Sequence, residues 1–152
     1  MEITKAPHQV LLRKTSIVPE SDIASGKYKN LVEEMRVAMK EHNGVGLAAN
    51  QTGHTVRIFI IDEKTAKTHE KPDAYINPEI TEYSDDTDEM EEGCLSLPQY
   101  YVPISRAKKI KIKAITLDGQ KVKFKARGFL ARVLQHETDH LNGILIKERV
   151  GR

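Results

Sequence analysis

The stretch from Gly128 to Leu141 limits the choice of fold most strongly, because it is too apolar to form a surface helix. At about 3.6 residues per turn, its hydrophobic side chains cover much of the circumference of a helix. These side chains are Phe129, Leu130, Val133, Leu134 and Leu141. Asn142-Gly143 then supplies a helix stop signal. We expect this helix to be buried and surrounded by strands.

Inside this apolar stretch lies the pattern His-Glu-x-x-His, at residues 136–140. One helical turn separates His136 from His140, so both imidazoles project from the same face and Glu137 lies beside them. Two ring nitrogens at this spacing bind a single divalent cation, and the neighbouring carboxylate is free to accept a proton from water. The pattern predicts a metal-dependent hydrolase.

The middle of the chain carries strand patterns. Residues 56–61 form an apolar run, which we expect at the centre of a sheet. Residues 75–80 predict another strand, and we place it near an edge because Pro78 cannot donate a ladder hydrogen bond. Between Lys109 and Lys125 lysines alternate with apolar residues, and Asp118-Gly119 turns the chain. This alternation predicts a β-hairpin.

Helix patterns lie near the two ends of the chain. Apolar side chains recur at helical spacing from Tyr28 to His42, with Ser21 or Ser25 as the candidate cap of that helix. Residues 1–19 are predicted to form an extended arm that packs on the body. We therefore predict an α+β fold, with antiparallel or mixed sheets packed around the buried metal-binding helix and an N-terminal helix.

The length of 152 residues suits one domain, which we place at residues 1–152. No apolar run approaches the roughly 20 residues that span a bilayer, and the N-terminus has no signal-peptide pattern, so we expect no membrane association and a cytoplasmic protein. Cys94 is the single cysteine, which excludes an intrachain disulfide and suits a reducing compartment. A net charge of +2 is too small to indicate specific nucleic-acid binding.

Charge is distributed unevenly along the chain. Residues 82–92 are strongly acidic and residues 106–127 are strongly basic. Because charge runs are usually solvated, we interpret the acidic run as a surface loop and the basic run as the exposed face of a sheet. An electrostatic role of the basic run near the translation machinery is the alternative.

Two histidines leave a catalytic metal site one protein ligand short. In metzincin proteases a third histidine follows the motif, but Ile146 stands at that position. A glutamate on a later helix, as in thermolysin, is excluded because only Glu148 lies beyond the motif. Cys94 is the remaining candidate, and its thiolate with two imidazoles suits Fe(II), Zn(II), Ni(II) or Co(II).

Three blocks together resemble the signature motifs of the peptide deformylases, in the expected order. They are Gly-Val-Gly-Leu-Ala-Ala-Asn-Gln at 44–51, Glu-Gly-Cys-Leu-Ser at 92–96 and Gln-His-Glu-Thr-Asp-His at 135–140. The resemblance implies the fold of that family and its reaction. Peptide deformylases remove the N-formyl group from the formyl-methionine of newly made polypeptides and release formate.

The motif match also implies roles for individual residues. The metal ligands are Cys94, His136 and His140, with Fe(II) as the usual physiological metal. Glu137 is the general base. The side-chain amide of Gln51 and the backbone N–H of Leu95 donate to the oxyanion.

The expected substrate is an extended N-formyl-methionyl nascent peptide, bound along strand edges at Val45-Gly46 and at residues 97–100. Val45, Phe129 and Val133 are the candidates for the methionine pocket, and a Glu92–Arg106 pair is expected to hold the cysteine loop.

The chain departs from the family pattern in two places. Many bacterial members carry a basic residue where this chain has Gln99-Tyr100-Tyr101, and many continue into a ribosome-docking helix beyond the position of Arg152. We therefore expect transient ribosome proximity without such a helix, and a monomer.

Two rival functions share the same residues. One is another metallopeptidase or amide hydrolase, which would cleave peptides internally or show no preference for a formyl group. The other is a metal-binding or peptide-binding module without catalysis, in which replacement of Glu137 would leave function intact.

Overall fold

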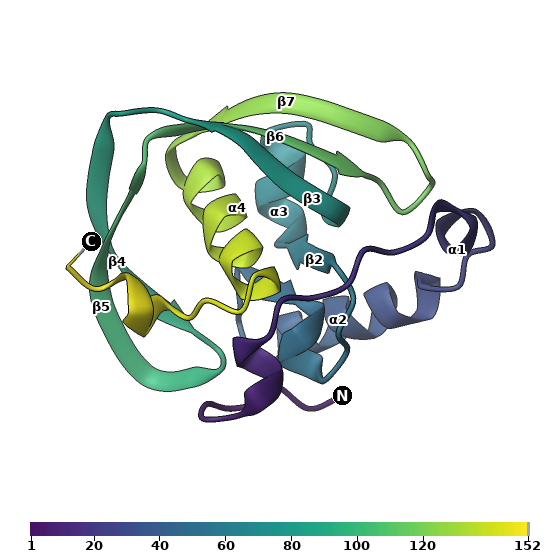
Figure 1. The fold of residues 1–152 in the computed structure, drawn as a ribbon, viewed down its shortest axis with the longest axis horizontal. Coiled ribbons are helices and arrows are strands. Elements are labelled where there is room, and N and C mark those ends of the chain that lie inside the picture. The colour runs from purple at the N-terminus through teal and green to yellow at the C-terminus, as the bar shows by residue number, and fades with distance from the viewer. Residues whose placement is uncertain (152) are drawn as a thin grey trace.

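The computed structural model describes residues 1–151, which form an α+β fold (Figure 1). The helices are α1 (Glu20–Ala24), α2 (Lys29–Glu41), α3 (Glu63–Thr68) and α4 (Gly128–Leu141), with 3₁₀ turns at Gln9–Leu12, Ala49–Thr52 and Ile146–Arg149. The strands are β1 (Gly46–Ala48), β2 (Ile58–Ile61), β3 (Ala74–Tyr83), β4 (Thr87–Cys94), β5 (Leu97–Ala107), β6 (Lys109–Ile115) and β7 (Lys121–Arg127). The predicted fold class is confirmed.

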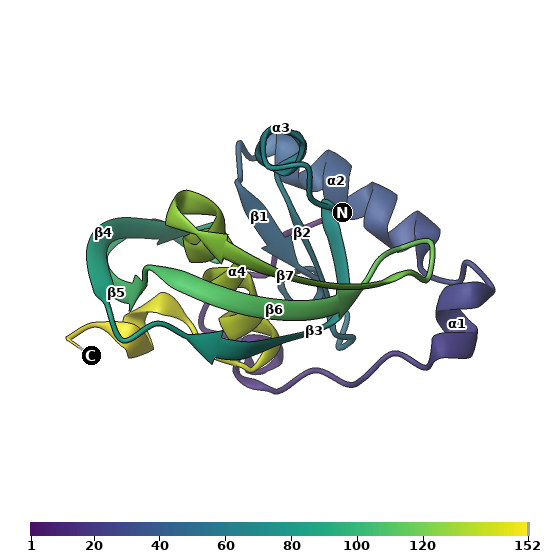
Figure 2. The same cartoon turned by 90° about the horizontal axis from the view of Figure 1, so that it is seen from above.

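The strands form two antiparallel sheets. One has five strands in the order β1-β2-β3-β6-β7, and the other consists of β4 and β5. Helix α4 lies under the arch of β3, β6 and β7, with the β4–β5 pair beside it (Figure 1), and Figure 2 shows the same sheet from above. It contacts strands of both sheets. The prediction of a buried helix surrounded by strands is confirmed.

Apolar packing holds α4 against the larger sheet. Leu130, Leu134 and Leu141 are buried in one cluster with Phe59 and Tyr75 from β2 and β3. A second cluster packs α2 against β1 and β2. Burial of such side chains stabilises the fold by roughly 1.5–3 kcal/mol each. The metal-binding motif is therefore carried by the most tightly enclosed helix of the chain.

The last carbonyl groups of α4 are satisfied by other segments. Nδ2 of Asn50 donates to the carbonyl of His140 at 2.5 Å. The carbonyl of Leu141 accepts from the hydroxyl of Thr15 at 2.9 Å and from Nη1 of Arg57 at 3.2 Å. Because a buried helix end without partners is costly, these bonds fix the position of the helix turn that carries His140.

The predicted hairpin is confirmed as β6 and β7. Its register pairs Lys111 with Lys125 and Lys113 with Lys123, and the turn contains Gly119 with φ of 86°. The apolar residues between the lysines face α4, while the lysine side chains lie on the opposite face. The interpretation of this basic run as an exposed sheet face is therefore correct, although Arg106 at its start is buried.

Strand β3 corrects the expectation for residues 75–80. The strand lies in the middle of the five-stranded sheet, not near an edge. The register shifts between Ile76 and Glu79, and Asn77 adopts a positive φ of 52° at this irregularity. A bulge leaves Pro78 without a required ladder bond, so an interior strand tolerates it.

Three local expectations were also wrong. Neither Ser21 nor Ser25 caps α2, because Tyr28 precedes that helix and both serines belong to the region of α1. The arm at residues 1–19 is not extended throughout, since it contains a 3₁₀ turn. The acidic run is not a surface loop, because most of it forms the end of β3 and strand β4, and its last acid, Glu92, is buried.

Among residues 1–151, no helix has the length and apolar character that crossing a membrane requires.

Candidate metal centre

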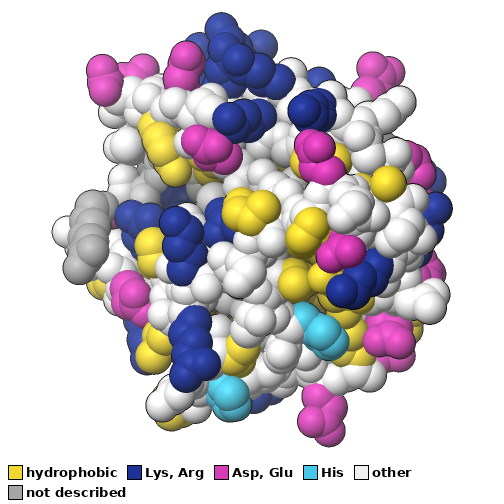
Figure 3. Space-filling view, turned by 45° about the vertical axis from the view of Figure 1, so that its right-hand side comes forward, with side chains coloured by type: hydrophobic (Ala, Val, Ile, Leu, Met, Phe, Trp, Pro, Cys, Tyr) yellow, Lys and Arg dark blue, Asp and Glu magenta, His cyan; other side chains and the backbone are white. Residues whose placement is uncertain are grey.

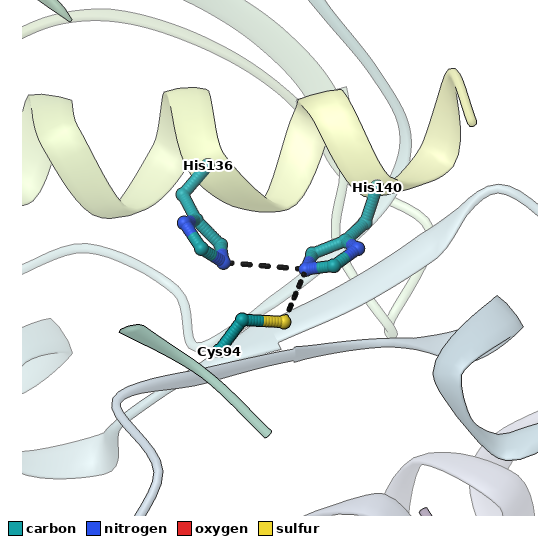
Figure 4. A group of neighbouring side chains, drawn as sticks. All are labelled: Cys94, His136 and His140. Carbon is teal, nitrogen blue, oxygen red and sulfur yellow. Dashed lines mark hydrogen bonds between the residues drawn. The ribbon is translucent and has the colours of Figure 1, made fainter. Parts of the chain in front are cut away.

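Cys94, His136 and His140 converge on one point although they come from two distant segments (Figure 4). Sγ of Cys94 lies 3.3 Å from Nε2 of His140, and that nitrogen lies 3.2 Å from Nε2 of His136. All three ligand atoms lie within 4.8 Å of one another. Strand β4 ends at the cysteine, and one turn of α4 supplies the two histidines.

These distances fit a small metal ion. Ligands bound at about 2.0–2.3 Å in a tetrahedron are separated from one another by about 3.3–3.8 Å. The separations of Nε2 of His140 from the other two ligand atoms, 3.2 and 3.3 Å, therefore come close to those that a tetrahedral ion requires. A soft thiolate with two imidazoles is a donor set for Fe(II), Zn(II), Co(II) or Ni(II) rather than for calcium or magnesium.

The thiol of Cys94 is held by donors on its own loop and on the 3₁₀ turn after β1. The backbone N–H of Ser96 donates to Sγ at 3.4 Å, and Nε2 of Gln51 lies 3.6 Å from the same atom. A side chain on Gly93 is sterically excluded, because the ring of Tyr101 occupies the place of its Cβ. Glycine at this position therefore allows the backbone of β4 to pass close to the ring of Tyr101 just before the cysteine.

Glu92 fixes the ring of His136 from the far side. Its carboxylate accepts from Nδ1 at 2.8 Å, and it also accepts from Arg106 at 2.8 and 2.9 Å and from Arg132 at 2.6 Å. Burial raises the pKa of Glu92, but the hydrogen bonds from His136 and Arg106 outweigh it and hold that pKa well below its usual range. Because Nδ1 carries the proton in this bond, Nε2 is left to bind the metal.

A second carboxylate extends this network toward the C-terminal segment. Asp139 accepts from Nη1 of Arg106 at 2.7 Å and from Arg149 through two bonds of 3.0 and 2.7 Å. The chain of ion pairs thus runs from His136 through Glu92, Arg106 and Asp139 to Arg149. It ties β4, β5, α4 and the last 3₁₀ turn together around the ligands.

The two histidines differ in their affinity for a proton. Burial and the neighbouring His136 lower the pKa of His140 well below its ordinary value. Burial also lowers the pKa of His136, but bonds to Cys94 and Glu92 outweigh it and raise that pKa to about 10. The two rings together therefore carry one positive charge, which lies on His136, where Cys94 and Glu92 accept its hydrogen bonds. A bound cation would take the place of that proton.

Glu137 lies beside the ligands and is almost completely buried. Its Oε2 is 3.9 Å from Nε2 of His136, and its Oε1 has no hydrogen-bond partner among the described residues. Burial is the main reason that the pKa of Glu137 rises to about 7. The carboxylate fits only because residue 46 is glycine, since a Cβ there would lie 2.5 Å from Oε2.

A cleft of about 630 Å³ opens onto this centre. Its lining includes Cys94, His136 and Glu137 together with the predicted residues Val45, Gly46, Gln51, Leu95, Phe129 and Val133. Val45 and Phe129 are exposed at its rim, whereas Val133 is buried. Residues that are far apart in the sequence are thus brought to one cavity. His140 is buried and is not among the residues that line the cleft.

The expected Glu92–Arg106 pair is present, but sequence reasoning missed three other residues of the site. Ser96 accepts from Nε2 of Gln51 at 3.0 Å, Arg132 binds Glu92, and Asp139 binds Arg106. Arg132 was detectable, because it is a charged residue one turn before His136 in a helix predicted to be buried, where a charge needs a partner. Asp139 was detectable for the same reason, as a carboxylate inside a buried helix.

The chain is similar to known proteins along its whole length. The sequence model of the family described as polypeptide deformylase matches residues 1–152. A peptide deformylase of Dictyoglomus turgidum is 48% identical over 149 residues, covering 98% of this chain and 92% of the relative. The crystal structure of peptide deformylase from Thermotoga maritima has a TM-score of 0.89 at 39% identity, covering 99% of this chain and 97% of that chain.

A further solved structure is that of a relative bound to Met-Ala-Ser. It is the class I type b peptide deformylase from Acinetobacter baumannii, with a TM-score of 0.89 at 35% identity. The alignment covers 99% of this chain and 98% of that chain.

Proposed function

The chain belongs to the peptide deformylase family, and we propose how its own residues carry out that family's reaction. The reaction removes the N-formyl group from newly made polypeptides. The observation that carries the proposal is the convergence of Cys94, His136 and His140 beside the buried carboxylate of Glu137, at the floor of a cleft. This arrangement brings a metal site and a base to the same cavity.

Cys94, His136 and His140 would hold one divalent metal ion. Such an ion, when bound, lowers the pKa of water and polarises a carbonyl oxygen. We propose Fe(II) as the physiological metal, with Zn(II), Ni(II) or Co(II) able to occupy the site. The mixed nitrogen and sulfur donor set supports this group of metals, and the family resemblance supports iron among them.

Glu137 is proposed as the group that moves the proton. As water oxygen bonds to the formyl carbon, the carboxylate accepts the water proton, and it then delivers this proton to the amine nitrogen as the carbon–nitrogen bond breaks. Formate and a free N-terminal amine result. A base whose pKa lies near the working pH can both accept and release a proton, and burial moves the pKa of Glu137 in that direction.

Gln51 and Leu95 are proposed as donors to the formyl oxygen. The side chain of Gln51 is oriented by the N–H of Ala48, which donates to Oε1 at 3.0 Å, so that Nε2 points toward Cys94 and Ser96. Leu95 follows the cysteine directly and lines the cleft. Donors that are in place before the reaction stabilise a developing oxyanion without reorganisation.

The peptide is proposed to lie along β1. This strand is an edge of the five-stranded sheet, so a substrate backbone can pair with it beside Val45 and Gly46. The methionine side chain would enter the cleft between Val45, Phe129 and Val133. The Met-Ala-Ser peptide bound to the Acinetobacter baumannii relative has the sequence of a deformylated product, which supports a formyl-methionyl peptide as the substrate of this cleft.

The domain organisation, the oligomeric state and the location are proposed as well. We propose a single catalytic domain at residues 1–152 that acts as a monomer in the cytoplasm, where nascent chains are made. Its contact with the ribosome is proposed to be transient.

A comparison of N-formyl-Met-Ala-Ser with N-acetyl-Met-Ala-Ser tests the proposed function. We expect rapid release of formate from the first and little release of acetate from the second. Internal cleavage, or equal rates for both, would favour the rival amide hydrolase. Glu137→Ala is expected to lose turnover by about 10²–10⁴-fold while it keeps its metal, whereas unchanged function would favour a binding module.

Anaerobic purification followed by metal analysis tests the identity of the ion. An iron-loaded protein should lose activity in air faster than zinc-loaded or nickel-loaded protein, because Fe(II) and its thiolate ligand oxidise. Zinc in the anaerobically isolated protein, without iron, would contradict the iron assignment.

A further inference from the structure

The two proposed donors to the formyl oxygen come from different sheets. Gln51 lies on the 3₁₀ turn that follows β1, and Leu95 lies in the turn between β4 and β5. Within residues 1–151, no strand pairing joins the five-stranded sheet to the β4–β5 pair. The strand ladders therefore do not set the distance between the two donors, and other contacts must do so.

Backbone hydrogen bonds from the N-terminal arm, purple in Figure 1, connect the two donor segments. The N–H of Thr4 donates to the carbonyl of Gln51 at 2.6 Å, and the N–H of Ala6 donates to the carbonyl of Ser96 at 2.8 Å. Ser96 directly follows Leu95 in the chain. The arm thus bridges the segment of one donor to the segment of the other, and we call this pair of bonds the arm clamp.

The arm clamp is anchored in the interior. Gln51 and Ser96, which accept its two bonds, are almost completely buried. Ile3, the residue before the clamp, is buried in one apolar cluster with Leu47 and Ala49. Because a buried carbonyl without a donor is costly, the two bonds hold the segments in this arrangement.

The side chain of Gln51 takes part in the same junction. Its Nε2 donates to Oγ of Ser96 at 3.0 Å and lies 3.6 Å from Sγ of Cys94. An amide nitrogen carries two hydrogens, so one is used by Ser96 while the other faces the side of the metal ligands. A shift of Ser96 relative to Gln51 would therefore change the direction of the hydrogen that is proposed to reach the formyl oxygen.

Stability alone explains the arm only in part. Chain termini are commonly held down by packing, and the burial of Ile3 does this for the arm. However, Lys5 lines the catalytic cleft, so the arm also forms part of the cleft wall. Both bonds of the arm clamp end on residues beside the metal ligand Cys94 or on a proposed oxyanion donor, and packing does not require that choice.

The outer surface gives less reason to expect a partner. Acidic side chains lie among the basic ones on the face that Figure 3 shows, so charges of opposite sign are close to one another there. The bonds of Thr4 and Ala6, by contrast, are directed to buried residues. The structure therefore points to an internal role of the arm.

We propose that the arm clamp positions the two oxyanion donors of the reaction. Thr4 and Ala6 are positioning residues, which act through Gln51 and through the turn that carries Leu95. This inference rests on the proposed function, because it takes both donors from there. Displaced donors would stabilise the transition state less while the peptide still binds, so the loss should appear in kcat rather than in KM.

Thr4→Pro tests the arm clamp, because proline has no N–H to donate to Gln51. We expect kcat for N-formyl-Met-Ala-Ser to fall about tenfold or more while KM changes by less than about threefold. Glu2→Pro is the matched control. Glu2 is exposed, and its N–H has no hydrogen-bond partner among the described residues, so this variant should keep both constants.

A double-mutant cycle separates positioning from a general loss of stability. Gln51→Ala alone should lower kcat by about 10²–10³-fold, as expected for the loss of one oxyanion donor. If the arm clamp acts through this side chain, adding Thr4→Pro to Gln51→Ala should lower kcat by less than about twofold more. A loss that multiplies in full in the double variant would overturn the proposal.

Ile3→Ala offers a second route if Thr4→Pro does not fold. It loosens the anchor of the arm without introducing a proline, and its loss of kcat should also disappear in the Gln51→Ala background. NMR of the zinc-loaded protein gives a readout without turnover. The side-chain amide signals of Gln51 should shift in Thr4→Pro and Ile3→Ala but not in Glu2→Pro, and unchanged signals in all three would contradict the arm clamp.

Failure of the proposed function and failure of the arm clamp give different results. Wild-type turnover in Gln51→Ala would overturn the proposed role of Gln51 and the inference with it. A slow Gln51→Ala together with wild-type kcat in folded Thr4→Pro would overturn the arm clamp alone.

Discussion

Glu92 and His136 form a hydrogen bond of 2.8 Å that determines which ring nitrogen faces the other ligands. The carboxylate occupies Nδ1, so Nε2 points at His140 and Cys94. Because the same carboxylate also binds two buried guanidinium groups, the ring is held by the most enclosed ion pairs of the protein. Metal binding and folding stability are therefore coupled through one residue.

Replacement of Glu92 by glutamine should weaken both properties. The amide nitrogen would face Arg106 or Nδ1 of His136 with donor against donor, and a buried guanidinium would lose its counter-charge. We expect a loss of about 3–5 kcal/mol in the free energy of unfolding and about 10–100-fold weaker metal binding. Urea unfolding and competition with a chelator measure the two effects.

Asp88→Asn is the matched control for that change. Asp88 also pairs with Arg132, at 2.8 Å, but its side chain is 55% exposed. Solvent screens this pair, so its loss should cost at most about 1 kcal/mol and leave metal affinity unchanged. Equal effects of the two substitutions would refute the special role of Glu92.

Gly46→Ala should disable the base without removing the metal. The added methyl group would lie 2.5 Å from Oε2 of Glu137, so the carboxylate must move. Because a small displacement of a catalytic group is costly, we expect kcat to fall about 10²-fold or more at unchanged metal content.

Gly53→Ala controls for the general cost of replacing a glycine. Residue 53 has φ of 83° and no atom within 4 Å of the added Cβ, so the strain there should lower stability while kcat is kept. A wild-type kcat in Gly46→Ala would show that Glu137 does not need its present position.

Much of this site was predictable because its chemistry depends on local spacing. The turn between His136 and His140, the apolar run around them and the period of two in β6 and β7 are all set by short-range geometry. The central place of β3 was not predictable, since it depends on a bulge at Asn77 that is held by hydrogen bonds to distant Val18. Long-range pairing of this kind leaves no periodic pattern in the sequence.

The Glu92–Arg106 pair was expected from the family resemblance and is present, but the rest of the charge network was missed for a related reason. Glu92 lies within an acidic run, and the run as a whole has the composition of a solvated loop. Only pairing of β4 with β5 and packing against α4 show that its last member is buried against Arg106 and Arg132. Composition predicts how exposed the segment is as a whole, whereas the role of Glu92 depends on the burial of that single side chain.

The pH dependence of the metal-free protein should report Glu137. Burial raises its folded pKa to about 7, above that of the unfolded chain, so the folded state binds the proton more tightly. Its contribution to stability is fully present below about pH 4.5 and is lost as pH rises through about 7. The loss amounts to about 3 kcal/mol.

Urea unfolding of the metal-free wild type and of Glu137→Gln across this range measures that contribution. The difference between the two free energies should shift against the wild type as pH rises. A difference that stays constant with pH would contradict the raised pKa. In the metal-loaded enzyme, the cation favours the carboxylate, so the acidic limb of kcat/KM should lie below pH 7.

The two arginines bound to Asp139 should differ in importance. Arg106 is buried between Asp139 and Glu92, whereas the side chain of Arg149 is 37% exposed. Arg106→Met removes the buried guanidinium that Glu92 and Asp139 share, so that one buried positive charge is lost between two carboxylates, and it should cost about 3–5 kcal/mol. Arg149→Met leaves Asp139 with one partner and access to water, so its cost should be at most about 1 kcal/mol. Thermal and urea unfolding of both variants measure the two losses of stability. Similar losses would show that the contact of Arg149 with Asp139 stabilises the fold as much as the buried contact of Arg106 with Asp139.

Tyr75 offers a test of the core that avoids the metal centre. Its ring stacks on Phe59 at 4.9 Å, but its buried hydroxyl has no hydrogen-bond partner among the described residues. Burial raises the pKa of this phenol above its ordinary value. Tyr75→Phe keeps the stacking and removes the unpaired group, so we expect a gain of about 1 kcal/mol in the free energy of unfolding at neutral pH.

The raised pKa of Tyr75 also predicts a pH dependence. In the unfolded chain the phenol ionises above about pH 10, whereas the buried phenol of the folded protein keeps its proton. Above that pH, wild-type stability should therefore fall more steeply than the stability of Tyr75→Phe. Parallel stability curves for the two proteins, or a loss above about 1 kcal/mol in the variant, would mean that the hydroxyl is satisfied in solution.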